Sequence, residues 1–344
     1  MKIKANRAAF LTALTPLVHL LRYNSLIDEA VGLLEYKNRR FYCKSEDNAC
    51  STRAPKSFVG GVPSFVVKGF DLVQFLQRGT SEGVNVSITD RNVTLSSGRS
   101  RATFTQFDQK VSFDVPSKWS SMGESFANAF ARASQCAARS YYRPILTAVH
   151  VAPDRMEASD SYQFLRMTGS FLKSEVLVPA TSNKLIQSVS PTKYKVVDNR
   201  MFFANGMGTV GVCFLLGGDF PSMAPLDKEL KSAVPMEFSK DIVEAIERCA
   251  VFVERNKFDE EKVVQVFIQK DLVSLDVESP SGNCHEEVTA KVPRKLVGCK
   301  FRVHPKLFAS CLSESRRVLV SKKTIHIYEE GKLWFTSALV GERS

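Results

Sequence analysis

The chain of 344 residues is 44% hydrophobic and 24% charged, which is typical of folded protein and excludes a disordered or fibrous chain. Its 47 Lys and Arg residues outnumber 36 Asp and Glu residues, and the formal net charge of +11 indicates a polyanionic partner without naming it. No apolar run reaches the ~18 residues of a membrane span, and the first twenty residues are not typical of a signal peptide, so we expect a cytoplasmic protein.

Six amphipathic helices are predicted along the chain, each from a capping residue followed by apolar residues at three- and four-residue spacing. They begin near Asn6, Lys68, Ser125, Pro179, Ser239 and His304. Short runs rich in Val, Ile, Phe, Tyr and Thr lie between the helices and predict antiparallel hairpins. The clearest are 84–89 with 92–96, 192–197 with 201–205, and 318–321 with 324–329 and 333–339.

The helices recur about every 60 residues, each followed by about three or four strands. This period is too long for a solenoid, so we interpret the six units as three similar domains of two helices each. The fold class expected is therefore α+β with antiparallel sheets. Turn residues and a shift in composition place the domains at 1–118, 119–232 and 233–344.

Catalytic and cofactor motifs are weak in this sequence. Residues 206–211 match G-x-G-x-x-G, but the strand-like composition of 212–216 favours a hairpin turn over a dinucleotide site. The eight cysteines form no C-x-x-C pair, and Cys284 next to His285 has no second ligand pair in register, so no zinc site is expected. Asp154, Glu157 and Asp160 are interpreted as solvated charges. We expect no catalytic residue, cofactor or metal, and therefore no enzyme.

Several segments resemble, in order along the chain, the bacterial or bacteriophage DNA polymerase III beta subunit, the beta sliding clamp. They are 97–107, 143–149, 157–160, 176–179, 218–221 and 248–258. The chain departs from that family at three places. It has Ser161 where the family has Gly, and Tyr162-Gln163-Phe164 where the family has His-Arg-Leu. Its carboxyl end, 338–344, also differs.

The resemblance implies a DNA-clamp fold that closes head to tail into a homodimeric ring with helices lining its hole. It also implies a processivity factor for DNA replication, which encircles double-stranded DNA without reading its sequence. The implied protein partners are a replicative DNA polymerase, a clamp loader, and other clamp-binding repair or ligation proteins.

Three groups of residues are expected to carry these roles. The basic residues expected to contact DNA phosphates, each of which could equally be a solvated surface charge, are Arg7, Arg22, Arg78, Arg132, Arg139, Arg143, Lys184, Lys240, Arg248 and Lys306. The resemblance implies a partner-peptide cleft formed by Leu146, Ser159, Ser161, Tyr162, Gln163, Phe164, Pro221, Leu226, Leu339 and Val340. It also implies a dimer interface in which edge strands carrying Arg101 and Phe104 meet Val251 and Phe252.

Two alternatives remain open. A basic DNA-binding replication accessory protein that forms no ring would share the charge. An enzyme acting on nucleic acid would need clustered acids or a metal set. Neither alternative accounts for the sixfold repeat.

Overall fold

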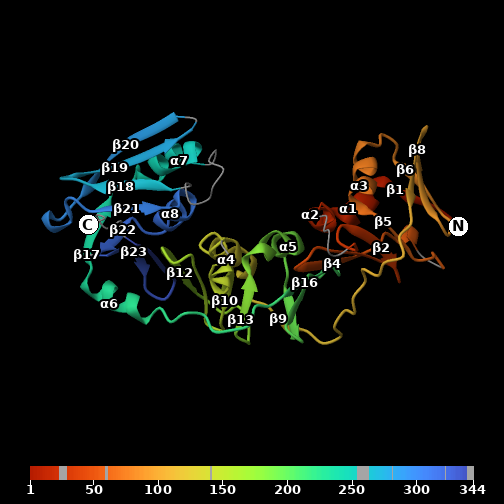
Figure 1. Cartoon of the computed structure of the whole chain (residues 1–344), viewed down its shortest axis with the longest axis horizontal. Coiled ribbons are helices and arrows are strands. Elements are labelled where there is room, and N and C mark those ends of the chain that lie inside the picture. Colours follow the sequence, from red (N-terminus) through yellow and green to blue (C-terminus); the bar gives the residue numbers. More distant parts are fainter. Residues whose placement is uncertain are drawn as a thin grey trace. The chain divides into compact units, whose positions relative to one another are not determined.

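The structure, a computed structural model, describes residues 1–22, 29–58, 61–139, 142–253, 263–280, 282–321 and 323–338. Two compact units make up the chain: unit 1 is Met1–Asn128 with Thr181–Gly217, and unit 2 is Ala129–Ala180 with Gly218–Ser344. Both are α+β with antiparallel sheets (Figure 1), which confirms the predicted fold class. Within the described residues, no helix is long and apolar enough to cross a membrane.

Unit 1 contains two sheets. The first has the order β1 (Lys2–Asn6), β6 (Gly83–Ile88), β7 (Asn92–Ser97) and β8 (Ser100–Thr105). The second has the order β5 (Phe65–Lys68), β2 (Leu33–Lys37), β3 (Arg40–Lys44), β4 (Asn48–Arg53), β16 (Val210–Phe214), β15 (Arg200–Ala204), β14 (Lys193–Val197) and β9 (Ser120–Ser121). Its helices are α1 (Arg7–Leu14), α2 (Val18–Leu21), α3 (Gly69–Arg78) and α5 (Asn183–Val189).

The start of α1 shows how the sequence sets these elements. Asn6 has an extended backbone, and its side-chain oxygen accepts a hydrogen bond of 2.9 Å from the backbone N–H of Ala9, as an N-cap does. Phe10 then points into an aromatic core, where its ring lies 5.0 Å from Phe58 and 5.4 Å from Phe41 between centroids. The core therefore forms between the first helix and the second sheet.

Unit 2 contains one long sheet. Its order is β13 (Val176–Pro179), β10 (Ala148–Val151), β11 (Arg155–Ser159), β12 (Gln163–Thr168), β24 (Leu333–Ala338), β23 (Thr324–Glu329), β22 (Arg317–Val320), β17 (Val234–Phe238), β20 (Gly282–Lys291), β19 (Leu272–Ser279), β18 (Val264–Ile268) and β21 (Lys300–Val303). Its helices are α6 (Ala224–Ser232), α7 (Ile242–Val253) and α8 (Pro305–Leu312), and α4 (Phe126–Ala133) contains the sequence boundary between the units.

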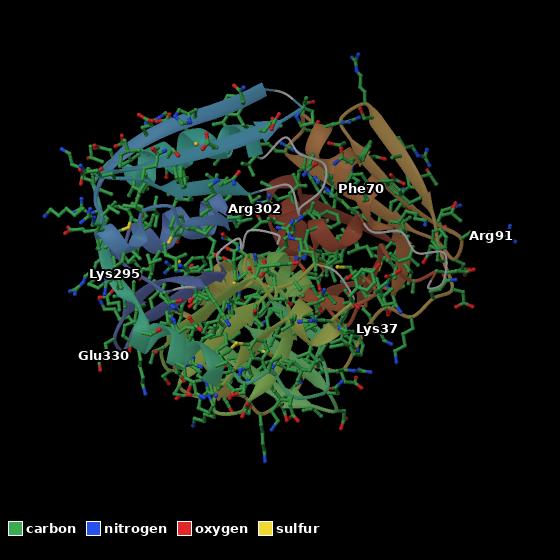
Figure 2. The ribbon with its side chains drawn as sticks, turned by 60° about the vertical axis from the view of Figure 1, so that its left-hand side comes forward. Lys37, Phe70, Arg91, Lys295, Arg302 and Glu330 are labelled. Atoms are coloured by element: carbon green, nitrogen blue, oxygen red, sulfur yellow. The ribbon has the colours of Figure 1, made fainter. Side chains whose placement is uncertain are left out.

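In both units, charged residues occur at tight turns between strands. Examples are Arg91 after β6 in unit 1 and Glu330 after β23 in unit 2 (Figure 2).

The six predicted helix starts are confirmed by α1, α3, α4, α5, α7 and α8, and the three predicted hairpin groups by their strand pairings. The G-x-G-x-x-G segment is a hairpin turn between β15 and β16, as expected. The region before residue 232 was interpreted as a boundary, yet it contains α6. The division into three domains at 118 and 232 stays a prediction.

The expectation of an edge strand at Val251 and Phe252 is wrong, because both residues lie in the last turn of α7. Apolar residues at 242, 245, 246, 249, 250 and 253 recur at helical spacing and are buried. Helix α7 packs against β19 and β20 (Figure 1), so burial of this face favours the helix over a strand.

Candidate functional site: a polar-floored cleft in unit 2

A cavity of about 280 Å³ opens in unit 2. It lies among the short turn 144–147, the β11–β12 hairpin, the segment that leads into α6, and strands β23 and β24. Its lining residues are Arg143, Leu146, Ser159, Ser161, Tyr162, Gln163, Phe164, Pro221, Ser222, Met223, Pro225, Leu226, Thr324 and Thr336. The lining mixes apolar side chains with hydroxyl groups, as peptide and small-ligand sites do.

The β11–β12 turn is held by short-range hydrogen bonds. The Asp160 carboxylate accepts the backbone N–H groups of Tyr162 (2.8 Å) and Gln163 (2.6 Å), and Ser159 Oγ accepts that of Ser161 (3.2 Å). Burial raises the pKa of Asp160, while these hydrogen bonds favour its charged form. Ser161 adopts φ +83°, a left-handed conformation that favours glycine.

One rim of the cavity is cationic. The Arg143 guanidinium donates a hydrogen bond of 3.1 Å to Ser161 Oγ and remains exposed. Tyr162 is 75% exposed, so its ring is available to a ligand without rearrangement. By contrast, Leu146 and Phe164 line the cavity with little exposure, and the Phe164 ring meets Trp334 edge to face at 5.3 Å.

The floor of the cavity is ordered by His326, which is fully buried. Burial lowers the pKa of His326 to about 4, so the ring is neutral near pH 7 and has one N–H. Trp334 Nε1 donates to His326 Nδ1 at 3.3 Å, which makes Nδ1 the acceptor and Nε2 the donor. His326 Nε2 then donates to Thr324 Oγ1, and the Thr336 hydroxyl donates to Nδ1, both at 2.7 Å.

The same chain of hydrogen bonds continues to α6. Ser321 donates to the Glu229 carboxylate at 2.7 Å, so Ser321 Oγ accepts the Thr324 hydroxyl proton at 2.9 Å. The protons of both threonine hydroxyls are thus directed into the protein. The oxygen atoms of Thr324 and Thr336 therefore present lone pairs to the cavity, and they favour a ligand that donates hydrogen bonds.

An ionic cluster around the buried His150 and Glu157 lies next to the segment that forms another wall of the cavity. His150 Nδ1 lies 2.7 Å from Glu157, its Nε2 lies 2.7 Å from Glu175, and its ring stacks on Phe220 at 5.1 Å. Burial opposes the charged forms of Glu157 and His150. Nevertheless, the hydrogen bond from His150 and the charge of Arg166 lower the pKa of Glu157 to about 2. The two glutamates raise the pKa of His150. Phe220 is thereby fixed immediately before the wall residue Pro221.

Eight of the ten residues expected in the cleft line this cavity, namely Leu146, Ser159, Ser161, Tyr162, Gln163, Phe164, Pro221 and Leu226. Leu339 and Val340 lie outside the described residues. Five further lining residues were not predicted from the sequence: Ser222, Met223, Pro225, Thr324 and Thr336. The first three fall where a domain boundary was predicted, and no local pattern distinguishes the two threonines from other strand residues.

Among the ten basic residues expected at DNA, hydrogen bonds or ion pairs within the protein are made by Arg7, Arg132, Arg143 and Arg248. Arg7 donates to the backbone oxygens of Leu76 and Ser81, at 3.1 and 3.0 Å, and so caps the end of α3. Arg132 pairs with Glu314, and Arg143 lies at the cleft. Arg248 makes a bidentate pair with Glu286 at 2.7 and 2.8 Å.

The other six have exposed side chains on or beside the helices: Arg22, Arg78, Arg139, Lys184, Lys240 and Lys306. Arg139 and Lys306 also have partners within the protein. Arg22 lies over the Phe70 ring, 5.7 Å from its centroid, and Arg78 lines a shallow cavity of about 380 Å³ between α3 and β8. Lys184 and Lys306 occupy the first turns of α5 and α8.

Two of the four expected interface residues, Arg101 and Phe104, lie at a sheet edge. Arg101 and Phe104 are on β8, which pairs with β7 and has no second strand neighbour among the described residues. In unit 2, β20 pairs with β17 only through Ala290 and Lys291, so in the described structure the remainder of that side is an open edge. Val251 and Phe252 lie on α7, which covers one face of β20.

Solved structures show the same fold over the full chain. The chain matches the DNA polymerase III beta chain of Streptococcus pneumoniae with a TM-score of 0.76 and 15% identity, over 99% of both chains. It matches the beta subunit of Thermotoga maritima (0.73, 15%) and the DNA polymerase sliding clamp of Bacillus subtilis (0.75, 14%), each again over 99% of both chains.

No protein-family model and no curated protein sequence matches this chain. The structural likenesses establish the fold, which is that of the bacterial DNA polymerase III beta subunit, and at this level they confirm the resemblance found in the sequence.

Proposed function

We propose that this chain is a sliding clamp, a non-enzymatic processivity factor for DNA replication. It would encircle double-stranded DNA as a head-to-tail homodimer in the cytoplasm, at the nucleoid or at a phage replication site. The observation that carries the proposal is the full-length fold likeness to solved sliding clamps. It is joined by the cleft, where eight of the residues assigned by resemblance line one cavity.

The open edges of β8 and β20 support ring closure. Two unpaired edges invite strand pairing between chains, and pairing them head to tail would remove both. Arg99 flanks β8 and Arg101 lies on it, whereas the acidic Glu287 lies on β20. In this proposal Val251 and Phe252 contribute from α7, behind the β20 edge.

The six exposed basic residues at the helices would contact DNA phosphates. A helix that crosses a groove brings its Lys and Arg side chains to phosphates and not to base edges, so every register along the duplex is nearly equivalent. Affinity would then fall with salt through counterion release. Residence on DNA would come from the closed ring.

The cleft would bind short peptide segments of a replicative DNA polymerase, a clamp loader, and repair or ligation proteins. Its buried Leu146 and Phe164 suit an apolar anchor, and its floor of lone pairs suits a neighbouring N–H donor. Because Tyr162 and Phe164 add aromatic bulk, we propose that compact aliphatic anchors bind better than a phenylalanine.

A topological test separates this function from ordinary surface binding. The protein is mixed with nicked circular DNA, its rings are closed with an amine-specific cross-linker that spares DNA, and the complexes are washed with 1 M NaCl. We expect retention on circles and release after one restriction cut. Protein cross-linked before DNA is added serves as the control and should not be retained.

Equal retention on circular and linear DNA would refute encirclement. It would favour the alternative, a basic DNA-binding replication accessory protein that does not form a ring.

A further inference from the structure

Cys249 and Cys284 bring two thiols together in unit 2. Cys249 lies on the buried face of α7, Cys284 lies near the start of β20, and their Sγ atoms are 3.6 Å apart. The two residues are 35 positions apart in sequence, so the tertiary packing of α7 on β20 creates this contact. All eight cysteines lie within the described residues, and all are free thiols.

We propose that Cys249 and Cys284 form a reversible intrachain disulfide when the protein meets a peroxide, and that this bond ties α7 covalently to β20. A disulfide needs its sulfur atoms about 2 Å apart, so the pair must close by roughly 1.5 Å. Adjustment of the two side chains supplies a movement of this size. The inference concerns unit 2 alone and does not depend on the proposed function.

The two thiols differ in access, and this sets the order of reaction. Cys249 is fully buried, whereas Cys284 is partly exposed. Burial raises the pKa of the Cys249 thiol, so this group stays protonated and meets oxidant slowly. Cys284 is therefore the thiol that reacts with a peroxide first.

The proposed reaction balances without another reagent. The Cys284 thiolate attacks one oxygen of hydrogen peroxide, the O–O bond breaks, and Cys284 becomes a sulfenic acid while hydroxide leaves and takes a proton to become water. The Cys249 sulfur then attacks the sulfenic sulfur, its own proton leaves, and the second oxygen departs as water. In sum, two thiols and one peroxide give one disulfide and two waters.

The two cysteines meet where other contacts already hold α7 against β20. Glu286, two residues beyond Cys284 on β20, holds Arg248 of α7 in the bidentate pair, and Gly282 lies beside the ring of Phe252. Residues 282, 284 and 286 alternate along the strand and so share one face. A disulfide would add a covalent link between contacts that already hold α7 to β20, so it should stabilise unit 2.

The chain offers an internal control in Cys43 and Cys50. They face each other as partners on β3 and β4, but both are fully buried, and burial raises the pKa of both thiols, that of Cys50 to about 12. Proximity without access should leave this pair reduced. If closeness in the fold were enough, both pairs would oxidise.

The test treats the whole, folded protein with a small excess of hydrogen peroxide and then blocks its remaining thiols. We expect loss of two of the eight thiols, a Cys249–Cys284 link in peptide mapping, a higher Tm, and full reversal by dithiothreitol. In the Cys249→Ser variant, Cys284 should instead react with dimedone as a sulfenic acid.

Three results on the wild-type protein would overturn the proposal: eight thiols remaining, a link that maps to Cys43 and Cys50, or Cys284 oxidised to sulfinic acid while Cys249 stays free. Because the wild-type protein supplies these results, a variant that fails to fold leaves the proposal testable.

Discussion

Ser161 is held in a left-handed backbone conformation at the rim of the cleft. A non-glycine residue in this region costs about 1–3 kcal/mol. The hydrogen bonds made by Asp160 and Ser159 around the turn maintain the conformation, and the Ser161 hydroxyl receives Arg143. Ser161 is therefore strained in its backbone, and its hydroxyl holds the Arg143 guanidinium at the rim of the cavity.

Replacing Ser161 with glycine should therefore stabilise the folded protein by about 1 kcal/mol, since relief of strain exceeds the 0.4–1 kcal/mol that glycine adds to unfolded-chain entropy. Urea unfolding would measure the change. Ser161→Ala is the matched control, because it removes the hydroxyl and keeps the strain, and it should give no gain. A glycine variant less stable than the alanine variant would mean that strain is negligible here.

His326 makes stability depend on pH. Its folded-state pKa of about 4 lies below the ordinary value of 6.5, so between these values the unfolded chain binds more protons and stability falls as pH falls. From pH 7 to pH 5 this group should cost about 2 kcal/mol of unfolding free energy.

Urea unfolding of the wild type and of His326→Gln at both pH values isolates this effect, because His19 (pKa about 4) and His150 (pKa raised) are common to both proteins. Between pH 7 and pH 5, the unfolding free energy of the variant should fall by about 2 kcal/mol less than that of the wild type. Equal losses would show that His326 is not kept neutral by burial.

At the scale of elements, β8 is an edge strand whose open side no other described strand covers. Its residues alternate between exposed and half-buried, and its open side presents unpaired backbone groups. Phe104 packs edge to face against Phe75 of α3, with centroids 6.4 Å apart, and remains half-exposed. This combination is typical of an edge that a second chain completes.

The substitution Phe104→Asp should convert the proposed dimer into monomers, because an unpaired carboxylate at a strand joint costs several kcal/mol. Light scattering measures the mass, and circular dichroism checks that unit 1 is folded. Val197→Asp, at another partly exposed apolar position on a strand of unit 1, is the control and should leave the dimer intact. A dimeric Phe104→Asp protein would place the joint elsewhere.

At the scale of the whole molecule, the proposed ring makes the mass in solution diagnostic. We expect about twice 38.3 kDa by light scattering at micromolar concentration. The same protein should bind unrelated duplex sequences with similar affinity, and that affinity should fall steeply with salt. A strict monomer would favour the non-ring accessory protein.

The sequence alone determined six helix starts, three groups of hairpin strands and the class of fold. Asn6 as a cap, the apolar spacing of α7 and the turn at 206–208 are local signals, because their partners lie within a few residues. Helix α6 was missed since its prolines, Pro221 before it and Pro225 in its first turn, are typical of linkers as well as of helix starts.

Only the tertiary structure decided which side chains meet. Arg132 pairs with Glu314 across 182 residues, Arg7 caps α3 across 69, and His326 orders a floor made by two strands and tied to Glu229. Four arginines expected at phosphates are engaged for this reason. Val251 and Phe252 lie in a helix because other residues of α7, at helical spacing, are buried where the helix packs against β19 and β20, and this outweighs the strand propensity of the two residues. Such pairings depend on which surfaces the packed core brings together, and that information is not present in any local pattern.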